Sequence, residues 1–307
     1  MLAPYLRKEI MTSNKQAPVD GRVLALYNDY AHGRIDRREF VRRVSALAIT
    51  GFTAAALIRS VMPDYAKAQQ VMFTDPRIRG EYVEYPSPQG SGMMRGYLVH
   101  PLEVQGPAPT VVVFHENRGL NPYIEDVARR AATQGFMSLA PDGLAPLGGY
   151  PGNDDAGREM QASLDADKLN QDMIASARFL KAREGSNGRL GATGFCWGGG
   201  MTNRLAVALG ADLNAAAPFY GAAVPADQVP MIQAPLMLQY AAEDMNINGQ
   251  AGPFQEALRA NNKDFVAHTY PGTMHGFHND STPRFVPEQA RIAEQRMWDF
   301  FRQHLSA

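Results

Sequence analysis

The sequence predicts an α/β fold with a mostly parallel sheet, and two observations lead to this prediction. From about residue 80 onward, short apolar runs alternate with helical patterns, which is the order expected of parallel strands joined by crossover helices. One run, Val111-Val112-Val113-Phe114, is continuously apolar and largely β-branched, as is typical of a strand buried on both faces. We therefore expect one domain over residues 69–307, with helices on both faces of the sheet.

The first two strands are predicted to form an antiparallel hairpin at one edge of this sheet. Glu81–Tyr85 and Met94–His100 are short strand-like segments separated by a turn rich in Gly, Ser and Pro. A loop rich in Pro and Gly is expected from Pro141 to about Asp155. The patterns that follow the hairpin predict strands at Pro109–His115, Phe136–Ala140, Leu190–Phe195, Leu213–Tyr220, Pro235–Tyr240 and Phe265–Tyr270, and helices at Ile124–Gln134, Asp167–Ala182, Met201–Leu209, Phe254–Ala260 and Pro287–His304.

Composition and charge narrow the classes of function. The chain has 307 residues, of which 45% are apolar and 20% charged, and this composition is globular. The formal net charge is −1, so the chain has no basic excess with which to hold a phosphate backbone. Nucleic acid is therefore not expected as a partner.

Residues 1–68 form a separate region that is predicted to be an export signal. Arg37-Arg38 is a twin-arginine pair, and an uncharged, mostly apolar run follows from Val44 to Ile58. This run is short for a membrane span, which needs roughly 20 apolar residues, but it suits a signal peptide. Ala66-Lys67-Ala68 then provides a cleavage pattern. The order resembles a Tat signal, so we expect recognition by the Tat machinery, cleavage after Ala68, and a periplasmic or secreted protein.

An alternative interpretation of this region is a retained N-terminal helical arm on a cytoplasmic protein. The stretch before Arg37 is long for a signal peptide, although a start at Met11 would shorten it. Residues Val23 to Tyr30 favour a short helix, and such an arm would pack on the body or on a second subunit. The pattern leaves open whether the protein is a monomer or a homodimer.

The chemistry of the chain centres on its single cysteine. One cysteine excludes an intramolecular disulfide, and an isolated cysteine is ordinarily a small, buried, inert residue. Here, however, Gly194-Phe195-Cys196-Trp197-Gly198 follows a predicted strand and precedes a helix, which is the nucleophile elbow G-x-S-x-G with Cys in place of Ser. The sharp turn requires small flanking residues, and the helix N-terminus favours the thiolate. We therefore predict an α/β-hydrolase fold with Cys196 as nucleophile.

Two further residues complete a predicted catalytic triad. In this fold the order along the chain is nucleophile, acid, histidine. Downstream of Cys196, Asp244 and His275 each follow a predicted strand, at the sheet edge where ligands bind. Glu243 is a rival for the acid and His278 a rival for the base. His275 is preferred because a short turn containing glycine separates it from its strand, and Gly276 follows it.

Across residues 80–307 the chain resembles the dienelactone hydrolase (carboxymethylenebutenolidase) family. The resemblance rests on Gly-Phe-Cys-Trp-Gly-Gly-Gly at 194–200, on the loop of Asp244, and on His275-Gly276-Phe277. It also rests on His-Glu-Asn-Arg-Gly-Leu-Asn at 115–121, which is similar to the family's segment after the third strand.

The resemblance implies a role for each matched side chain. Cys196 would attack the carbonyl of an ester or lactone, His275 would transfer the proton, and Asp244 would orient His275. Glu116 would match the family's glutamate that contacts the resting thiol and helps to deprotonate it; the competing interpretation is an ion pair with Arg118 at the strand end.

The backbone N–H groups of Trp197 and Asn117 are expected to form the oxyanion hole. The resemblance implies this pair of donors. The general rule for the fold gives the same answer, because the residue after the nucleophile and one in the loop after the third strand supply these donors.

The resemblance is weaker at the position that binds the substrate's carboxylate. Family members that act on dienelactone hold this group with arginines, one of them shortly after the catalytic histidine, whereas residues 276–280 here contain no Arg and end in Asp280. Arg118 or Arg158 would have to serve instead, and Arg284 is interpreted as a surface residue. An anionic lactone and an uncharged ester or lactone both remain open as substrates.

No cofactor or metal is expected, and three other functions compete. The sequence contains neither HExxH nor CxxC, and no P-loop or dinucleotide fingerprint. A general carboxylesterase or thioesterase would use the same fold. A secreted binding protein without turnover is the alternative from another class, and it would be free to lose the residues of the triad. A redox sensor is disfavoured because Cys196 has no resolving partner.

Overall fold

A computed structural model describes residues 20–48, 53–66 and 68–306. The chain divides into two compact units, one ending at Met62 and the other beginning at Pro63. Residues 63–68, which the sequence assigned to the export segment, thus belong to the second unit. Lys67 of the predicted cleavage pattern and both candidate start positions, Met1 and Met11, lie outside the described residues.

The described part of the N-terminal unit is helical. Its helices are α1 (Gly21–Ala31), α2 (Arg37–Leu47) and α3 (Ala54–Val61). Each helix has an N-cap side chain that accepts a hydrogen bond from a first-turn backbone N–H, namely Asp20, Asp36 and Thr53. The three helices share a small core built from Val23, Tyr27, Tyr30, Phe40, Val44 and Val61.

Three sequence patterns of this unit can be located on its helices. The helix expected at Val23–Tyr30 is confirmed by α1. Arg37 and Arg38 are the first two residues of α2. The apolar run from Val44 to Ile58 is divided between the end of α2 and the start of α3, and its central residues 49–52 lie outside the described residues.

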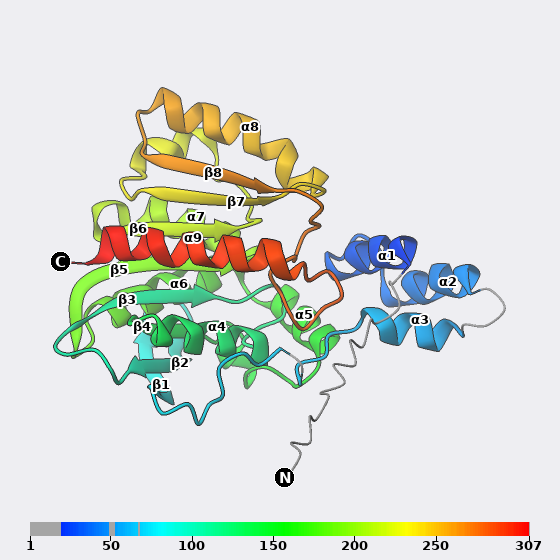
Figure 1. The fold of residues 1–307 in the computed structure, drawn as a ribbon, viewed down its shortest axis with the longest axis horizontal. Helices are drawn as coiled ribbons and strands as arrows, with labels where there is room; N and C mark the ends of the chain where they lie inside the picture. Colours follow the sequence, from blue (N-terminus) through cyan, green and yellow to red (C-terminus); the bar gives the residue numbers. More distant parts are fainter. Residues whose placement is uncertain (1–19, 49–52, 67, 307) are drawn as a thin grey trace, which may run out of the picture. The chain divides into compact units, whose positions relative to one another are not determined.

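The second unit contains one eight-stranded sheet with the order β1-β2-β4-β3-β5-β6-β7-β8 (Figure 1). β1 pairs with β2 and β2 with β4 in antiparallel fashion, and the other neighbours are parallel. This arrangement confirms the predicted sheet and its antiparallel edge hairpin. The strands are β1 (Ile78–Ser87), β2 (Gly92–Pro101), β3 (Ala108–Phe114), β4 (Met137–Pro141), β5 (Ser186–Phe195), β6 (Ala215–Phe219), β7 (Leu236–Ala241) and β8 (Phe265–Tyr270).

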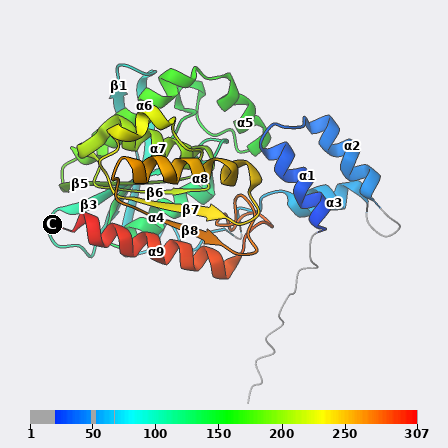
Figure 2. The ribbon, with the colours of Figure 1, turned by 90° about the horizontal axis from the view of Figure 1, so that it is seen from above.

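Helices cover both faces of the sheet, each over its own apolar core. α4 (Pro122–Thr133) and α9 (Pro287–Leu305) lie on one face, while α6 (Ala166–Lys181), α7 (Trp197–Leu209) and α8 (Met245–Ala260) lie on the other (Figure 2). Residues 111–114 are fully buried, as their apolar run predicted. The remaining helical segments are α5 (Asp154–Ser163) and the short 3₁₀ turns Ala145–Leu147, Gly210–Asp212 and Ala226–Met231.

The structure differs from the sequence prediction mainly at two helices. α5 was not predicted, because only Gly157 and Gln161 of its ten residues are buried and the segment lacks an apolar stripe. α8 was predicted to begin at Phe254 but begins at Met245, where Asp244 is its N-cap. The first turns of this helix were not predicted because glycines and a proline within residues 249–253 have low helix propensity.

The strand order places a topological switch point at β3. The chain runs from β3 to its neighbour β4 and then crosses back to β5 on the other side of β3. In an open α/β sheet, ligands bind at the carboxyl ends of the strands beside such a point. The loops that follow β3 and β5 are therefore where a reactive site is expected.

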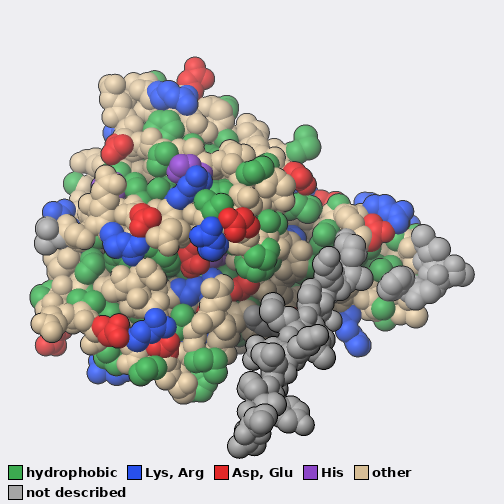
Figure 3. Space-filling view, in the orientation of Figure 1, with side chains coloured by type: hydrophobic (Ala, Val, Ile, Leu, Met, Phe, Trp, Pro, Cys, Tyr) green, Lys and Arg blue, Asp and Glu red, His purple; other side chains and the backbone are tan. Residues whose placement is uncertain are grey.

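The surface has no strongly charged face in the view of Figure 3, where basic and acidic side chains are interspersed. Among the described residues, no helix is both long enough and apolar enough to cross a membrane.

Candidate active site

Cys196 lies on a strained turn between β5 and α7. Its backbone has φ 59° and ψ −115°, a left-handed conformation that side chains other than glycine rarely adopt. The Cys196 N–H donates to the carbonyl of Phe219 on neighbouring β6 at 3.2 Å, which helps to hold the turn. The half-buried thiol thus stands at the N-terminus of α7, where the positive end of the helix dipole favours negative charge.

The glycines around Cys196 allow this turn because their neighbours approach too closely for a side chain. A Cβ on Gly194 would lie 2.3 Å from the carbonyl oxygen of Gly198. A Cβ on Gly198 would lie 2.5 Å from the carbonyl oxygens of both Phe114 and His115, at the end of β3. The packing expected from the sequence is confirmed, and it sets α7 directly against the start of the loop after β3.

Asp244 and His275 meet at the carboxyl edge of the sheet. Nδ1 of His275 is hydrogen bonded to Oδ2 of Asp244, and both side chains are buried. Oδ1 of Asp244 accepts from the backbone N–H of Ile247, so the same carboxylate caps α8 and is fixed in orientation. A ring nitrogen of His275 and Sγ of Cys196 lie within 4.8 Å of each other. The structure therefore brings together the three residues that the sequence predicted as a triad.

The two rival residues are not part of this arrangement. Glu243 is exposed, unlike its neighbour Asp244. Nδ1 of His278 is paired with the hydroxyl of Tyr123 at 2.8 Å, and burial lowers the pKa of His278 well below its ordinary value. His278 is thus a neutral packing residue.

The electrostatics of His275 favour its protonated form. Burial acts to lower the pKa of His275, but the charge of Cys196 and the hydrogen bonds with Asp244 and Cys196 outweigh it and raise the pKa to about 9. Because Nδ1 faces Asp244, Nε2 is the ring nitrogen left to face the thiol. The arrangement can hold an imidazolium beside Cys196 at neutral pH.

Glu116 follows β3 and is buried, with 2% of its surface exposed. Its Oε2 accepts from Nδ2 of Asn279 at 2.8 Å. Oδ1 of Asn279 accepts from the N–H and the hydroxyl of Ser281, which fixes the amide so that its NH₂ points at the carboxylate. An uncharged donor therefore holds Glu116, and the guanidinium of Arg118, the competing partner, contacts Asp154 instead.

The two predicted substrate-binding arginines contact carboxylates of α5. Nη1 of Arg118 lies 2.9 Å from Oδ2 of Asp154, and the Arg118 side chain is buried. Nη2 of Arg158 lies 3.8 Å from Oδ1 of Asp155. Each arginine is thus at least partly neutralised by an acidic partner within the protein.

The predicted oxyanion donors belong to the two segments that Gly198 brings together. Trp197 is the first residue of α7, so its N–H is one of the helix-terminal donors without an acceptor inside the helix. Asn117 follows Glu116 in the loop after β3 and is half-buried.

Comparison with known proteins decides the family. The model of the dienelactone hydrolase family matches residues 94–305, which include every predicted site residue. The chain belongs to the dienelactone hydrolase family. It is a hydrolase that acts on carboxylic esters. A second family model, described as YqhI-like, matches residues 11–47 in the N-terminal unit.

Individual relatives agree with this assignment. A provisionally named carboxymethylenebutenolidase of Methylorubrum extorquens is 32% identical over 274 residues, covering 83% of this chain and 89% of the relative. A provisionally named hydrolase fragment, YghX, of Escherichia coli K12 is 63% identical over 113 residues, covering 37% of this chain and 97% of the fragment. A crystal structure titled as a dienelactone hydrolase of Klebsiella pneumoniae, also provisionally, superposes with a TM-score of 0.63 at 27% identity, covering 73% of this chain and 99% of that one.

Three residues near the site of this dienelactone hydrolase family member were missed by sequence reasoning. The ring of Tyr220, at φ 36°, lies 4.8 Å from that of His275. The ring of His115 stacks on Trp197 at 5.2 Å. Arg284 was interpreted as a surface residue, which is wrong: it is 3% exposed and packs on Gly276, where an added Cβ would lie 2.9 Å from its guanidinium carbon. Tyr220 directly follows β6 at the carboxyl edge of the sheet, and this position in the sequence could have predicted that it lies near the site. The sequence has no comparable signal for Arg284.

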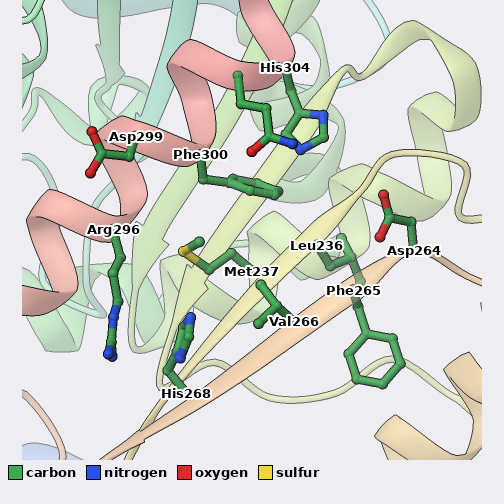
Figure 4. Close-up of a pocket in the computed structure, with 11 residues that line it drawn as sticks. Leu236, Met237, Asp264, Phe265, Val266, His268, Arg296, Asp299, Phe300 and His304 are labelled. Carbon is green, nitrogen blue, oxygen red and sulfur yellow. The ribbon is translucent and has the colours of Figure 1, made fainter.

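A surface groove of this hydrolase is lined by residues other than the predicted triad. It has a volume of about 440 Å³ and runs between β7, β8 and α9 (Figure 4). His268 and Arg296 line it together with apolar residues such as Val266 and Phe300, and it contains none of the predicted site residues.

Proposed function

We propose that this enzyme opens a carboxylic ester or lactone through a Cys196–His275–Asp244 triad and a thioacyl-enzyme intermediate. The observation that supports the proposal is the position of the His275 ring, which is hydrogen bonded to Asp244 and lies beside Cys196 at a strained elbow. Nucleophile, base and orienting acid in this order are the recurring machinery of acyl transfer.

The proposed reaction has two halves. In the first, the Cys196 thiolate attacks the carbonyl carbon, the C–O bond of the tetrahedral intermediate breaks, and the leaving oxygen takes the Nε2 proton of His275. This half leaves a thioester on Cys196 and a neutral imidazole. In the second, His275 takes a proton from water as the water oxygen attacks the thioester, and collapse releases the acid and restores the thiolate with its imidazolium. A lactone yields one product that carries both the acid and the hydroxyl.

Two groups beside the triad are proposed to assist. The N–H groups of Trp197 and Asn117 would stabilise the oxyanion, since Gly198 packs their segments together. Glu116 would contact Cys196 and take the proton from any Cys196 still in the thiol form before attack, as the family resemblance implies. Its buried carboxylate, held by Asn279, is suited to accept a proton without leaving its position.

The substrate class is proposed to be an uncharged ester or lactone. Arg118 and Arg158 both contact acidic side chains of α5, which lowers their ability to hold a substrate carboxylate. Residues 276–280, shortly after His275, contain no arginine, and Asn279 among them is directed at Glu116. The ratio of turnover with an aryl acetate to turnover with an unsaturated lactone separates a general carboxylesterase from a lactonase.

The proposed intermediate can be trapped. Acid quenching during steady turnover of an aryl acetate should leave a single acetyl group on the peptide that contains Cys196, because acylation and deacylation are separate steps. Peptide mass spectrometry is the measurement. Acetyl found only on another residue contradicts the thiol mechanism, and an enzyme that turns over neither compound favours the catalytically silent binding protein.

The raised pKa of His275 predicts the alkaline side of the pH profile. Below about 9 the ring carries the proton that the leaving oxygen needs, and above it that proton is lost, so kcat/KM should fall as the pH rises through about 9. In Asp244→Asn the hydrogen bond to a carboxylate is replaced by one to an amide, which lowers the pKa of His275 and moves the fall to lower pH.

This variant is a sharp test because asparagine is as good an N-cap as aspartate, so α8 is preserved. The measurement is kcat/KM for an aryl acetate from about pH 6 to about pH 10. If kcat/KM of Asp244→Asn falls at the same alkaline pH as that of the wild type, the pairing with Asp244 does not cause the raised pKa of His275.

Export by the Tat machinery remains a proposal for the N-terminal region. The twin arginines at the start of α2 support it. The capped helices with a shared core, and the YqhI-like match over residues 11–47, support the alternative of a retained N-terminal arm. N-terminal sequencing of the protein from its native host distinguishes them: a first residue after Ala68 supports export with cleavage, and a first residue at Met1 or Met11 supports the arm.

A further inference from the structure

Asp154 links three side chains around the loop that precedes α4. It is the first residue of α5, and its Oδ1 accepts from the hydroxyls of Tyr65 and Tyr150, each at 2.7 Å. Its Oδ2 accepts from Nη1 of Arg118 at 2.9 Å. We call residues 115–121, which contain Glu116 and Asn117, the oxyanion loop.

Tyr65 connects Asp154 to the far end of the oxyanion loop. Its hydroxyl donates to Asp154 and accepts from Nδ2 of Asn121 at 2.9 Å. The direction is fixed, because an ionised carboxylate can only accept and the amide nitrogen can only donate. Oδ1 of Asn121 accepts from the backbone N–H of Ile124, so the same side chain is also the N-cap of α4. Burial and the charge of Asp154 raise the pKa of Tyr65 well above its ordinary value, so its hydroxyl keeps its proton.

The middle of the oxyanion loop is held by α5 itself. The N–H of Gly119 donates to Oε1 of Gln161 at 3.1 Å. An added Cβ on Gly157 would lie 2.3 Å from the carbonyl oxygen of Arg118, so the helix backbone lies directly against the loop. Hydrogen bonds thus hold three residues of the loop, Arg118, Gly119 and Asn121. Asn117 lies just before them in the chain.

We propose that Tyr65 and Asp154 are positioning residues that hold the oxyanion loop so that the Asn117 N–H reaches the developing oxyanion. The inference rests on the proposed function, because it matters only if that N–H is an oxyanion donor. It has a consequence for the N-terminus: Tyr65 precedes the predicted cleavage site, and a cut after Ala68 would remove it. On this inference, a cut after Ala68 would lower kcat.

The test compares two tyrosines that contact the same oxygen. Tyr65→Phe removes the link between Asp154 and Asn121. Tyr150→Phe removes a hydrogen bond to the same Asp154 oxygen, and although the Tyr150 hydroxyl also interacts with that of Tyr65, this variant leaves the chain from Asp154 through Tyr65 to Asn121 in place. With an aryl acetate and the full chain, kcat should fall about tenfold in Tyr65→Phe, with KM within about twofold, because a displaced donor weakens mainly the transition state. Tyr150→Phe should stay within about twofold of the wild type.

A second readout separates loop position from thiol reactivity. Alkylation of Cys196 by iodoacetamide forms no carbonyl oxyanion, so its rate at neutral pH should be unchanged in Tyr65→Phe while ester turnover falls. Equal losses in both tyrosine variants, unchanged kcat in Tyr65→Phe, or a matching loss of alkylation would each overturn the inference.

If Tyr65→Phe does not fold, Asn121→Ser answers the same question. Serine keeps the N-cap of α4 but loses the donor to Tyr65, and it should give the same fall in kcat with unchanged alkylation. Wild-type kcat in Asn121→Ser would overturn the inference. Turnover by Cys196→Ala tests the proposed cysteine mechanism separately. If Cys196→Ala has no activity and Tyr65→Phe is fully active, the mechanism stands and only the positioning role of Tyr65 is rejected.

Discussion

Replacing Cys196 with alanine is expected to reduce turnover of both an aryl acetate and an unsaturated lactone by about four orders of magnitude or more, the scale seen when a nucleophile of a triad is removed. Alanine keeps a Cβ at this strained φ of 59°, so the elbow loses the sulfur without gaining new backbone freedom. Since the chain has one cysteine, a thiol titration reads one group per chain in the folded wild type and none in the variant.

The control for this prediction is stability. Cys196 is half-buried and is the N-cap residue of α7 without a side-chain capping hydrogen bond, so its removal should change the melting temperature by only a few degrees. Loss of activity with an unchanged melting temperature identifies a chemical role. Activity that persists in the variant means that the nucleophile has been assigned wrongly, whatever the rate of the wild type.

The three residues of the proposed triad could be brought together from the sequence because each is positioned by local structure. Cys196 follows a buried strand and precedes a helix, and the glycines around it indicate the sharp turn of a nucleophile elbow. Asp244 and His275 each follow a parallel strand, and parallel strands end at one edge of the sheet. Chain order and strand direction together are enough to place three side chains in one region.

The supports of the site could not be predicted, because they depend on contacts between segments with no local signal. Asp154 was assigned to a loop, since α5 has no apolar stripe from which to predict a helix. Tyr65 was assigned to an export segment, yet its hydroxyl bonds to a residue 89 positions away. Arg284 was treated as a surface residue because charged side chains are mostly exposed, and its burial against Gly276 is a tertiary feature.

Replacing Gly198 with alanine is expected to lower the free energy of unfolding by about 3 kcal/mol and kcat by about 100-fold. The added Cβ would lie 2.5 Å from two backbone carbonyl oxygens, those of Phe114 and His115, and a backbone group at the end of a central strand cannot rotate away as a side chain would. The only relief is to move α7 away from β3. That movement separates the Trp197 N–H from the oxyanion loop, so stability and catalysis fall together.

Gly200→Ala is the matched control, two residues further along the same helix. Its added Cβ would lie 3.4 Å from its nearest neighbour, the backbone nitrogen of Ala222, which is close to ordinary contact. Alanine is favoured over glycine in a helix by about 1 kcal/mol, so this variant should be as stable as the wild type or slightly more so. Urea denaturation and aryl acetate kinetics on both variants are the measurements. Equal losses in the two would mean that α7 tolerates no added methyl anywhere; a loss confined to Gly198→Ala ties the activity to the single contact between the elbow helix and the end of β3.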